Sequence, residues 1–285
     1  MEGTEKHLVA IVAPGAMGSA VAKRLTGNGV TVLTSLEGRS AASIKRARAA
    51  SMIPVSVDRL LEADIFLSIV PPGEAEGLAK QLSPALATAR RKPIYADCNA
   101  VNPRSVEAIA AIVQATGTPF VDAGIIGGPP KQGVPGPTFY LSGERAGEVA
   151  ELAPFGLECR VLDGPAGAAS ALKMSYAGIT KGLTALASIM ILSATRAGTA
   201  DALRDELSHS QPMLLAWFER QIPSMSGKAY RWVAEMEEIA GFVEEDEAGR
   251  ELFQNAARLY ERLAEDVAGP KTETEALARF FRKDE

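Results

Sequence analysis

The chain has 285 residues, 47% of them hydrophobic and 23% charged, a globular composition that excludes disordered, collagenous and low-complexity proteins. Its 30 basic and 35 acidic side chains give a formal net charge of -5, so no overall positive field exists to hold a nucleic acid. Two cysteines and two histidines are too few for a disulfide framework or for a metal site recognisable from spacing. We therefore expect no nucleic-acid partner, no metal and a reducing, cytoplasmic location.

Two apolar stretches resemble membrane segments. The first, LVAIVAPGAMGSAVA, lacks the positive flank of a signal peptide, and Pro14 would break a helix in its middle. The second, from Gly182 to Thr195, is closed by Lys181 and Arg196 and is shorter than the roughly 18 residues that a bilayer requires. We expect no membrane partner and interpret the second stretch as a buried helix.

Short apolar, β-branched runs alternate with helix-length segments up to about residue 165. The predicted strands are 8–12, 30–34, 65–70, 94–96, 120–122, 138–141 and 160–162, with 53–55 as a less marked candidate. The predicted helices between them are 19–27, 40–50, 73–86 and 103–115. This alternation predicts an α/β fold with a Rossmann-type, doubly wound parallel sheet buried on both faces.

Beyond Pro165 the strand patterns stop and alanine- and leucine-rich segments follow, which predicts an all-α C-terminal domain. Its first helix is expected over about 168–195, a length that suits a spine between two domains or subunits. Apolar side chains at helical spacing predict packed core at Trp232, Met236, Ile239 and Val243, and at Leu252, Ala256, Leu259 and Leu263. The last residues, 271–285, are expected to form a solvated tail or a docking helix. We divide the chain into a dinucleotide-binding domain, 1–165, and a helical substrate and dimerisation domain, 166–285.

Residues 8–24, LVAIVAPGAMGSAVAKR, read as a strand, a tight turn and a helix. The dinucleotide fingerprint G-x-G-x-x-G falls on Ala13, Gly15 and Gly18, with alanine in the first place. Alanine is compatible with the turn if its φ is negative, Gly15 lets the backbone approach a pyrophosphate, and Gly18 lets the helix approach the strand. At the first strand–helix junction the motif predicts a dinucleotide site rather than a purely structural turn. The expected contacts are Pro14, Gly15, Ala16, Met17 and Gly18.

The end of the second strand, VTVLTSLEGRS, bears on the choice of nucleotide. Glu37 is a candidate for the carboxylate that binds the ribose hydroxyls of NAD. Arg39 and Ser40 follow at once, and a guanidinium and a hydroxyl suit a 2′-phosphate. We predict NADP, with NAD as the alternative. Arg39 and Ser40 can also simply open the next helix, with Ser40 as its N-cap.

Two later strands end in residues that we expect at the cofactor crevice. Ligands of open α/β sheets bind at the carboxyl ends of the strands. The run ADIFLSIVPP therefore suggests contacts from Val70, Pro71 and Pro72, and YADCNAVNP suggests Asn99. For Asn99 and the nearby Asn102, a role in turn formation is the alternative.

The motifs IVAPGAMG, SIVPP, YADCNAVNP, VDAGIIGGPPKQGVPG and GPAGAASALKMSYAGITKG together resemble the β-hydroxyacid dehydrogenases within the 6-phosphogluconate dehydrogenase superfamily. They span about residues 6–195 in the order and spacing of that family. The remainder is similar to the helical C-terminal domain of a bacterial branch whose substrates are mostly unassigned. The resemblance implies hydride transfer with NAD(P), a small-molecule substrate and a homodimer built on the long interdomain helix.

In this family a lysine on the long helix is the catalytic acid/base, and Lys173 matches its position. A base is needed on the hydroxyl when hydride leaves its carbon, and a desolvated lysine beside a cationic nicotinamide favours its neutral form. The alternative is a lysine that extends from the helix into solvent. The family's asparagine four residues later is Ala177 here. Tyr176 and Thr180 lie on nearly the same helix face and are candidates to supply a hydroxyl, Tyr176 as a second catalytic residue and Thr180 toward the substrate.

A second departure concerns the family's loop D-A-P-V-S-G-G, in which the serine and main-chain amides hold a substrate carboxylate. The chain has Ile126 in place of the serine, after Ile125 and before Gly127 and Gly128. The two glycines keep their amides, but the isoleucines make the pocket more apolar, which suits a bulkier or less charged carbonyl, or an imine. Ordinary core packing is the alternative for both isoleucines.

We therefore expect an NADP-dependent oxidoreductase of the β-hydroxyacid dehydrogenase type, acting between nicotinamide and a hydroxy or carbonyl substrate. One alternative is an imine reductase on the same architecture. Another is a non-catalytic NAD(P)-binding protein, suggested by the missing serine and asparagine. Decarboxylation of 6-phosphogluconate is not expected, because that enzyme's long C-terminal domain is lacking.

Overall fold

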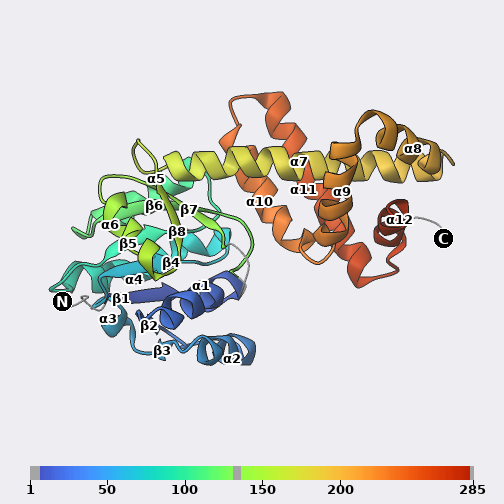
Figure 1. The fold of residues 1–285 in the computed structure, drawn as a ribbon. Helices are drawn as coiled ribbons and strands as arrows, with labels where there is room; N and C mark the ends of the chain where they lie inside the picture. Colours follow the sequence, from blue (N-terminus) through green and yellow to red (C-terminus); the bar gives the residue numbers. More distant parts are fainter. Residues whose placement is uncertain (1–6, 131–135, 283–285) are drawn as a thin grey trace. The chain divides into compact units, whose positions relative to one another are not determined.

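A computed structural model describes residues 7–130 and 136–282 of the chain, and the structural statements below concern these residues. The chain divides into two compact units, Met1–Met174 and Ser175–Glu285, which are described separately (Figure 1). The division falls within the long helix, later in the chain than the boundary predicted after Pro165. The roles assigned to residues 1–165 and 166–285 stay predictions.

The first unit is built on one eight-stranded sheet with the order β3-β2-β1-β4-β5-β6-β7-β8. The strands are β1 (Leu8–Val12), β2 (Thr31–Thr34), β3 (Ile53–Pro54), β4 (Ile65–Ser68), β5 (Ile94–Asp97), β6 (Phe120–Ile126), β7 (Thr138–Ser142) and β8 (Glu158–Val161). Every predicted strand is present, and the strand order reverses between the parallel neighbours β1 and β4, the point at which open α/β sheets bind ligands. The predicted fold class is confirmed.

One pair of strands departs from the parallel pattern. β7 runs antiparallel to β6, with Gly124 opposite Tyr140 and Ile126 opposite Thr138. No helix occurs in the described part of the connection between them, and a parallel pair requires a long crossover, so a direct return to the neighbouring position is antiparallel. β6 also continues to Ile126, so the two isoleucines belong to a strand rather than to the predicted loop.

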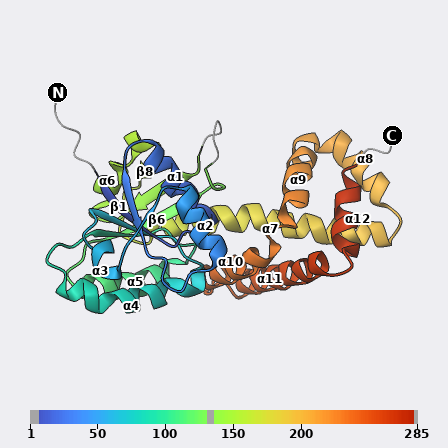
Figure 2. The ribbon, with the colours of Figure 1, turned by 90° about the horizontal axis from the view of Figure 1, so that it is seen from below.

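Helices cover both faces of the sheet, as Figure 2 shows. They are α1 (Ala16–Gly27), α2 (Ala41–Ala49), α3 (Val57–Leu60), α4 (Ala75–Thr88), α5 (Pro103–Gln114) and α6 (Ala146–Ala150), with 3-10 turns at Pro72–Glu74 and Ala153–Phe155. Because side chains alternate along a strand, Val9 and Ile11 of β1 pack with α1, α2 and α6. Ala10 and Val12 pack with α3, α4 and α5. The short helices α3 and α6 were not predicted.

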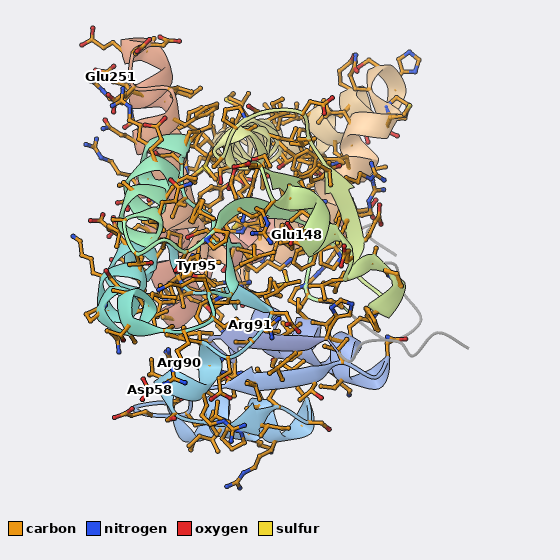
Figure 3. The ribbon with its side chains drawn as sticks, turned by 90° about the vertical axis from the view of Figure 1, so that its left-hand side faces the viewer. Asp58, Arg90, Arg91, Tyr95, Glu148 and Glu251 are labelled. Atoms are coloured by element: carbon orange, nitrogen blue, oxygen red, sulfur yellow. The ribbon has the colours of Figure 1, made fainter. Side chains whose placement is uncertain are left out.

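An aromatic stack lies on the face of the sheet that packs against α3, α4 and α5. The ring of Tyr95 stacks on Phe66 and Phe120, with centroids 5.1 and 6.0 Å away. Tyr95 lies within the first unit and comes from β5 (Figure 3). Burial raises the pKa of this phenol, first through desolvation and then through the nearby Asp97 carboxylate. The rings on β4, β5 and β6 therefore pack together as part of the core.

The described residues of the second unit form helices joined by short connections, without a strand. Helix α7 (Ala168–Arg196) starts in the first unit and continues into the second, where α8 (Ala200–Ser210), α9 (Pro212–Met225), α10 (Ala229–Phe242), α11 (Glu247–Ala268) and α12 (Thr272–Phe280) follow. Glycines bring α7 close to α11: a Cβ at Gly178 would lie 3.2 Å from Cζ of Phe253. Tyr260 donates a hydrogen bond of 2.6 Å to the carbonyl of Lys181. The segment near the C-terminus docks as α12 through the buried Leu277 and Phe280.

The predicted core stripes of α10 and α11 are mostly buried, but the prediction was wrong for Leu252. This side chain is 62% exposed, while Ala256, Leu259 and Leu263 are buried. Phe253 takes the inward place at the start of α11, where it packs against the glycines of α7. The spacing alone was equally compatible with Leu252.

Helix α7 is, by length and composition, long and apolar enough to cross a membrane, with a mean hydropathy of 1.5 over its most apolar window. This differs from the sequence expectation, which considered only the stretch between Lys181 and Arg196. The core helix of a globular protein passes the same test, but the interpretation as a buried helix was wrong for much of the stretch, because 39% of the window is buried and Leu186 and Met190 are 60% and 54% exposed.

Candidate active site

The turn between β1 and α1 presents main chain to an approaching ligand. Gly15 is the N-cap of α1 and carries no side-chain cap, and a Cβ at this position would meet no atom within 4 Å. A Cβ at Gly18 would lie 2.1 Å from the carbonyl oxygen of Ala13, so only glycine lets the helix lie this close to the turn. Ala13 has no positive φ, the condition under which alanine is compatible with the first position. The loop therefore fits a pyrophosphate at the positive end of a helix.

The turn after β2 carries the three residues that were predicted to contact the adenosine ribose, Glu37, Arg39 and Ser40. Glu37 is exposed and its amide donates to the Ser35 hydroxyl at 3.4 Å. Gly38 has a φ of +67°, and the amide of Arg39 closes the turn on the carbonyl of Leu36 at 3.2 Å. Ser40 caps α2, as one interpretation of the sequence predicted, while Arg39 is half-buried and makes no cap.

A residue that we did not predict completes this corner. Arg46, on α2, donates from Nε to the carbonyl of Pro14 at 3.1 Å and from Nη2 to the Ser43 hydroxyl at 2.9 Å. Nothing in the sequence distinguishes Arg46 from its basic neighbours Lys45 and Arg48, because only the packing of α2 against the β1–α1 turn brings it to Pro14.

The side chain of Asn99 joins the carboxyl ends of β4 and β5. Its Oδ1 accepts from the amide of Val70 at 2.7 Å, and its Nδ2 donates to the Ser68 hydroxyl at 2.9 Å. Pro71 is exposed beside this link, and Pro72 opens a 3-10 turn. Asn102 caps α5 by accepting from the amides at positions 104 and 105, the turn role left open above. The predicted crevice residues of β4 and β5 are therefore neighbours.

Lys173 extends from α7 to the same strand end. The side chain is half-buried, and its Nζ donates to the carbonyl oxygen of Asn99 at 3.3 Å. The helix lies against β6: a Cβ on Gly124 would lie 2.6 Å from the carbonyl of Ala169 and 3.3 Å from Cβ of Lys173. The amino group therefore lies near the carboxyl end of β5, in the region where sheets of this kind hold their ligands.

The first turn of α7 is anchored by Asp122 of β6, whose role the sequence did not reveal. The Oδ2 atom accepts from the amides of Gly167 and Ser170, both at 2.9 Å, and from the Ser142 hydroxyl at 3.1 Å. The Oδ1 atom accepts from the Ser170 hydroxyl at 2.6 Å. A carboxylate at a helix N-terminus satisfies amides that lack partners and matches the helix dipole. This anchor sets the position of the turn that carries Lys173.

A second carboxyl group lies directly opposite Asp122 on β5. Asp97 is buried, its Oδ1 accepts from the amide of Asn99 at 3.0 Å, and its Oδ2 has no hydrogen-bond partner among the described residues. Desolvation raises its pKa to about 6, against the hydrogen bonds from Asn99, with further repulsion from Asp122 and attraction to Lys173. Burial also raises the pKa of Cys98 well above its usual range, so this thiol stays protonated.

The remaining predicted site residues differ in how exposed they are to solvent. Ile125 is buried in the sheet core, the packing alternative named above, and Ile126 is half-buried. Gly127 and Gly128 are exposed, and Gly127 has a φ of +127° that favours glycine. In the second unit Tyr176 is 52% exposed, and the Thr180 hydroxyl is bonded to the Tyr176 carbonyl at 2.9 Å. In residues 7–130 and 136–282, no group of three or more metal-ligating side chains is found.

Comparisons with known proteins agree with this geometry. The model of the NAD binding domain of 6-phosphogluconate dehydrogenase matches residues 8–155, and a domain of unknown function, DUF1932, matches residues 194–263. An uncharacterised 28.5 kDa protein of Methanothermus fervidus is 29% identical over 187 residues, 64% of this chain and 69% of that protein.

Solved structures share the fold over nearly the whole chain. A conserved protein of unknown function, described as similar to 3-hydroxyacid dehydrogenases, is 27% identical with a TM-score of 0.72, covering 92% of this chain and 98% of its own. The 3-hydroxyisobutyrate dehydrogenase of Mycobacterium tuberculosis, with L-serine, is 18% identical with a TM-score of 0.67, covering 98% of this chain and 100% of its own. A reductive aminase of Aspergillus terreus, with NADPH, cyclohexanone and allyl amine, is 17% identical with a TM-score of 0.56 over 98% of this chain and 100% of its own.

The family model covers more than half of the chain, and its matched residues hold a glycine turn open to a pyrophosphate and the point where the strand order reverses. The chain therefore belongs to the family defined by the NAD binding domain of 6-phosphogluconate dehydrogenase, a family of NAD(P)-dependent oxidoreductases.

Proposed function

We propose that the chain is an NADP-dependent oxidoreductase of the β-hydroxyacid dehydrogenase type, with Lys173 as its acid/base. The observation that carries this proposal is the position of the Lys173 amino group, 3.3 Å from the Asn99 carbonyl at the carboxyl end of β5. A lysine that serves only solubility would extend into solvent, whereas Lys173 is half-buried at a strand end that also forms the ligand crevice.

The bound nicotinamide supplies the chemistry of hydride transfer, and the chain supplies the proton. In the oxidative direction neutral Lys173 takes the proton of the substrate hydroxyl as its carbon loses hydride. In the reductive direction the ammonium returns that proton to the oxygen. The Asn99 carbonyl orients the amino group, and the Asp122 anchor holds the helical turn that carries it. Tyr176 is proposed as a second catalytic group.

The cofactor contacts follow from the loops already described. The amides of Ala16 and Met17, at the uncapped start of α1, would hold the pyrophosphate between Pro14, Gly15 and Gly18. Val70, Pro71, Pro72 and Asn99 would line the crevice at the ends of β4 and β5. Arg39 and Ser40 would favour the 2′-phosphate of NADP over the ribose hydroxyls, with Glu37 on the exposed side of the turn.

The substrate is proposed to be a small molecule with a hydroxyl or carbonyl group. Gly127 and Gly128 would present amides to it, Ile126 would favour an apolar body over a second charge, and Thr180 would offer a hydroxyl. Relatives of the same fold include a 3-hydroxyisobutyrate dehydrogenase, which supports a hydroxy acid or its carbonyl counterpart.

Replacing the lysine tests the acid/base role. Lys173→Ala is expected to lower turnover by roughly 2 to 4 orders of magnitude, because a proton must move in the transition state. The dissociation constant for NADPH should change little, since the amino group is assigned to the substrate side. Steady-state kinetics and fluorescence titration measure the two quantities. Wild-type-like turnover in the variant would remove Lys173 from the mechanism.

Imine reduction is the second candidate. The apolar side chains in place of the family's serine favour it, and a reductive aminase shares the fold. A panel of cyclic imines assayed beside hydroxy acids and ketones separates the two functions. Turnover of imines alone would assign the chain to the second class. Tight cofactor binding without turnover on either panel would favour a non-catalytic NAD(P)-binding protein.

A further inference from the structure

We propose that Arg46 on α2, together with the Ser43 hydroxyl, forms the inner wall of a site for the 2′-phosphate of the cofactor and sets its preference for NADPH. This inference rests on the proposed use of NADP. It concerns a side chain that no motif in the sequence identifies and that only the packing of α2 brings to the nucleotide loop.

The guanidinium of Arg46 bridges two elements of the cofactor crevice. Its Nε donates to the Pro14 carbonyl in the β1–α1 turn, and its Nη2 donates to Ser43 in the first turn of α2. The side chain is half-buried, so it lies between the two elements instead of extending into solvent. The 2′-position of an adenosine bound to this loop faces the end of β2 and hence this corner.

The donors left on Arg46 suit a phosphate. A guanidinium carries five N–H groups in a planar fork, and the two bonds to described residues use two of them. The others are available to an anion, for which the fork geometry favours a bidentate contact. The existing bonds also fix the fork in advance, which lowers the entropy lost when a ligand binds.

The residues around Arg46 favour a negatively charged ligand. The first turn of α2 has no acidic residue, Ser40 and Ser43 place two hydroxyls there, and the helix adds its positive end. Arg39 approaches from the β2 side and is half-buried as well. The one carboxylate of the turn, Glu37, is exposed and free to point to water. A ribose hydroxyl gains little from two guanidinium groups, whereas a phosphate gains from both.

A purely structural role makes a different prediction. If Arg46 only holds the Pro14 loop against α2, its loss weakens NADPH and NADH equally, because both place their pyrophosphate on that loop. If Arg46 binds the 2′-phosphate, its loss weakens NADPH selectively. The ratio of the two dissociation constants therefore distinguishes the roles without any measurement of turnover.

The experiment is fluorescence titration of NADPH and NADH into the wild-type protein, Arg46→Gln and the control Arg48→Gln. Arg48 lies on the same helix, is exposed and carries the same charge, so its replacement reports on the general field of α2 alone. We expect Arg46→Gln to weaken NADPH about 10- to 100-fold, as befits hydrogen bonds to a charged group, with NADH within about twofold. Arg48→Gln should change both by less than about twofold.

The probes 2′,5′-ADP and 5′-AMP repeat the comparison without the nicotinamide half, and the same selective loss is expected for 2′,5′-ADP. Circular dichroism and thermal melting check that the variant is folded, and Arg46→Lys, which keeps the charge but not the fork, should fall between wild type and Arg46→Gln. Equal weakening of both nucleotides, or none, in a wild-type background that prefers NADPH would overturn the role of Arg46 alone. A wild-type protein that prefers NADH would overturn the proposed cofactor itself.

Discussion

At the scale of single residues, Asp97 stands out because one of its carboxyl oxygens is buried without a hydrogen-bond partner among the described residues. Its pKa is raised to about 6 from 3.8, chiefly by desolvation, so the folded chain binds a proton here more tightly than the unfolded chain does. The contribution of this group to the free energy of unfolding is therefore complete below about pH 4 and is lost as the pH rises through 6.

Asp97→Asn removes this titration. Asparagine keeps an acceptor for the Asn99 amide and carries no charge to desolvate. Near pH 7.5 the variant is expected to be more stable than the wild type by about 1 to 3 kcal/mol, and the difference should shrink toward pH 4. Urea unfolding across pH 4 to 8 measures it.

The exposed Asp58, labelled in Figure 3, provides the control for Asp97. Asp58→Asn should leave the shape of the stability curve against pH unchanged. A difference between Asp97→Asn and wild type that does not vary with pH would show that the Asp97 carboxyl does not titrate in this range.

Individual residues were predictable where a motif links a chemical role to a local backbone conformation. Gly15 and Gly18 follow from the turn that they must make, and the resemblance pointed to Lys173. Asp122 and Arg46 were not predictable, because the partners Gly167 and Pro14 lie 45 and 32 positions away in the chain. Such pairs depend on how strands and helices pack, which spacing along the chain does not encode.

At the scale of elements, the start of α7 depends on β6 through Asp122. This carboxylate accepts four hydrogen bonds, from Gly167, from Ser142 and from the amide and hydroxyl of Ser170. The amide of an asparagine offers one acceptor oxygen and would turn its NH2 group toward donors. Asp122 is therefore a positioning residue for the turn of helix that carries Lys173.

Asp122→Asn is expected to lower the free energy of unfolding by about 2 to 4 kcal/mol, because buried amides lose charged partners. We also expect kcat to fall at least tenfold, while the NADPH dissociation constant stays within about twofold, since the glycine loop is remote in the sheet. Ser170→Ala, which removes only the hydroxyl bond, should cost about 1 kcal/mol and serves as the milder control. Loss of stability with unchanged kcat would make the anchor structural alone.

Elements with a strong local pattern were predicted correctly. All eight strands and α7 follow from β-branched runs and from a long apolar helix signal. The four-residue α3 and five-residue α6 are too short to show periodicity. The antiparallel direction of β7 depends on where the chain returns to the sheet, and no residue of Thr138–Ser142 encodes that direction.

At the scale of the whole molecule, α7 carries an apolar stripe in the second unit that no described side chain covers fully. It consists of Ile179, Leu183, Leu186 and Met190, which are 66%, 38%, 60% and 54% exposed. The intervals of three and four residues place them on one helix face. Such a stripe is typical of a contact between chains, which supports the predicted homodimer.

Leu186→Glu is expected to convert that dimer to a monomer, because a carboxylate on the stripe would be desolvated at the contact. Light scattering after size-exclusion chromatography measures the mass. Leu252→Glu is the matched control, since Leu252 is 62% exposed but lies on α11, outside the stripe. A wild-type chain that elutes as a monomer, or a dimer that survives Leu186→Glu, would contradict the assigned contact.

The close approach at Gly124 also limits how this enzyme can diversify. Any side chain there would act as a wedge between β6 and the helix, since even a methyl group would meet the Ala169 carbonyl at 2.6 Å and crowd Cβ of Lys173. If the substrate binds as proposed, changes in its preference are therefore expected at Ile126, where the strand leaves the core. On β6, Gly124 is therefore constrained by the helix that carries Lys173, and side chains can vary more freely at Ile126.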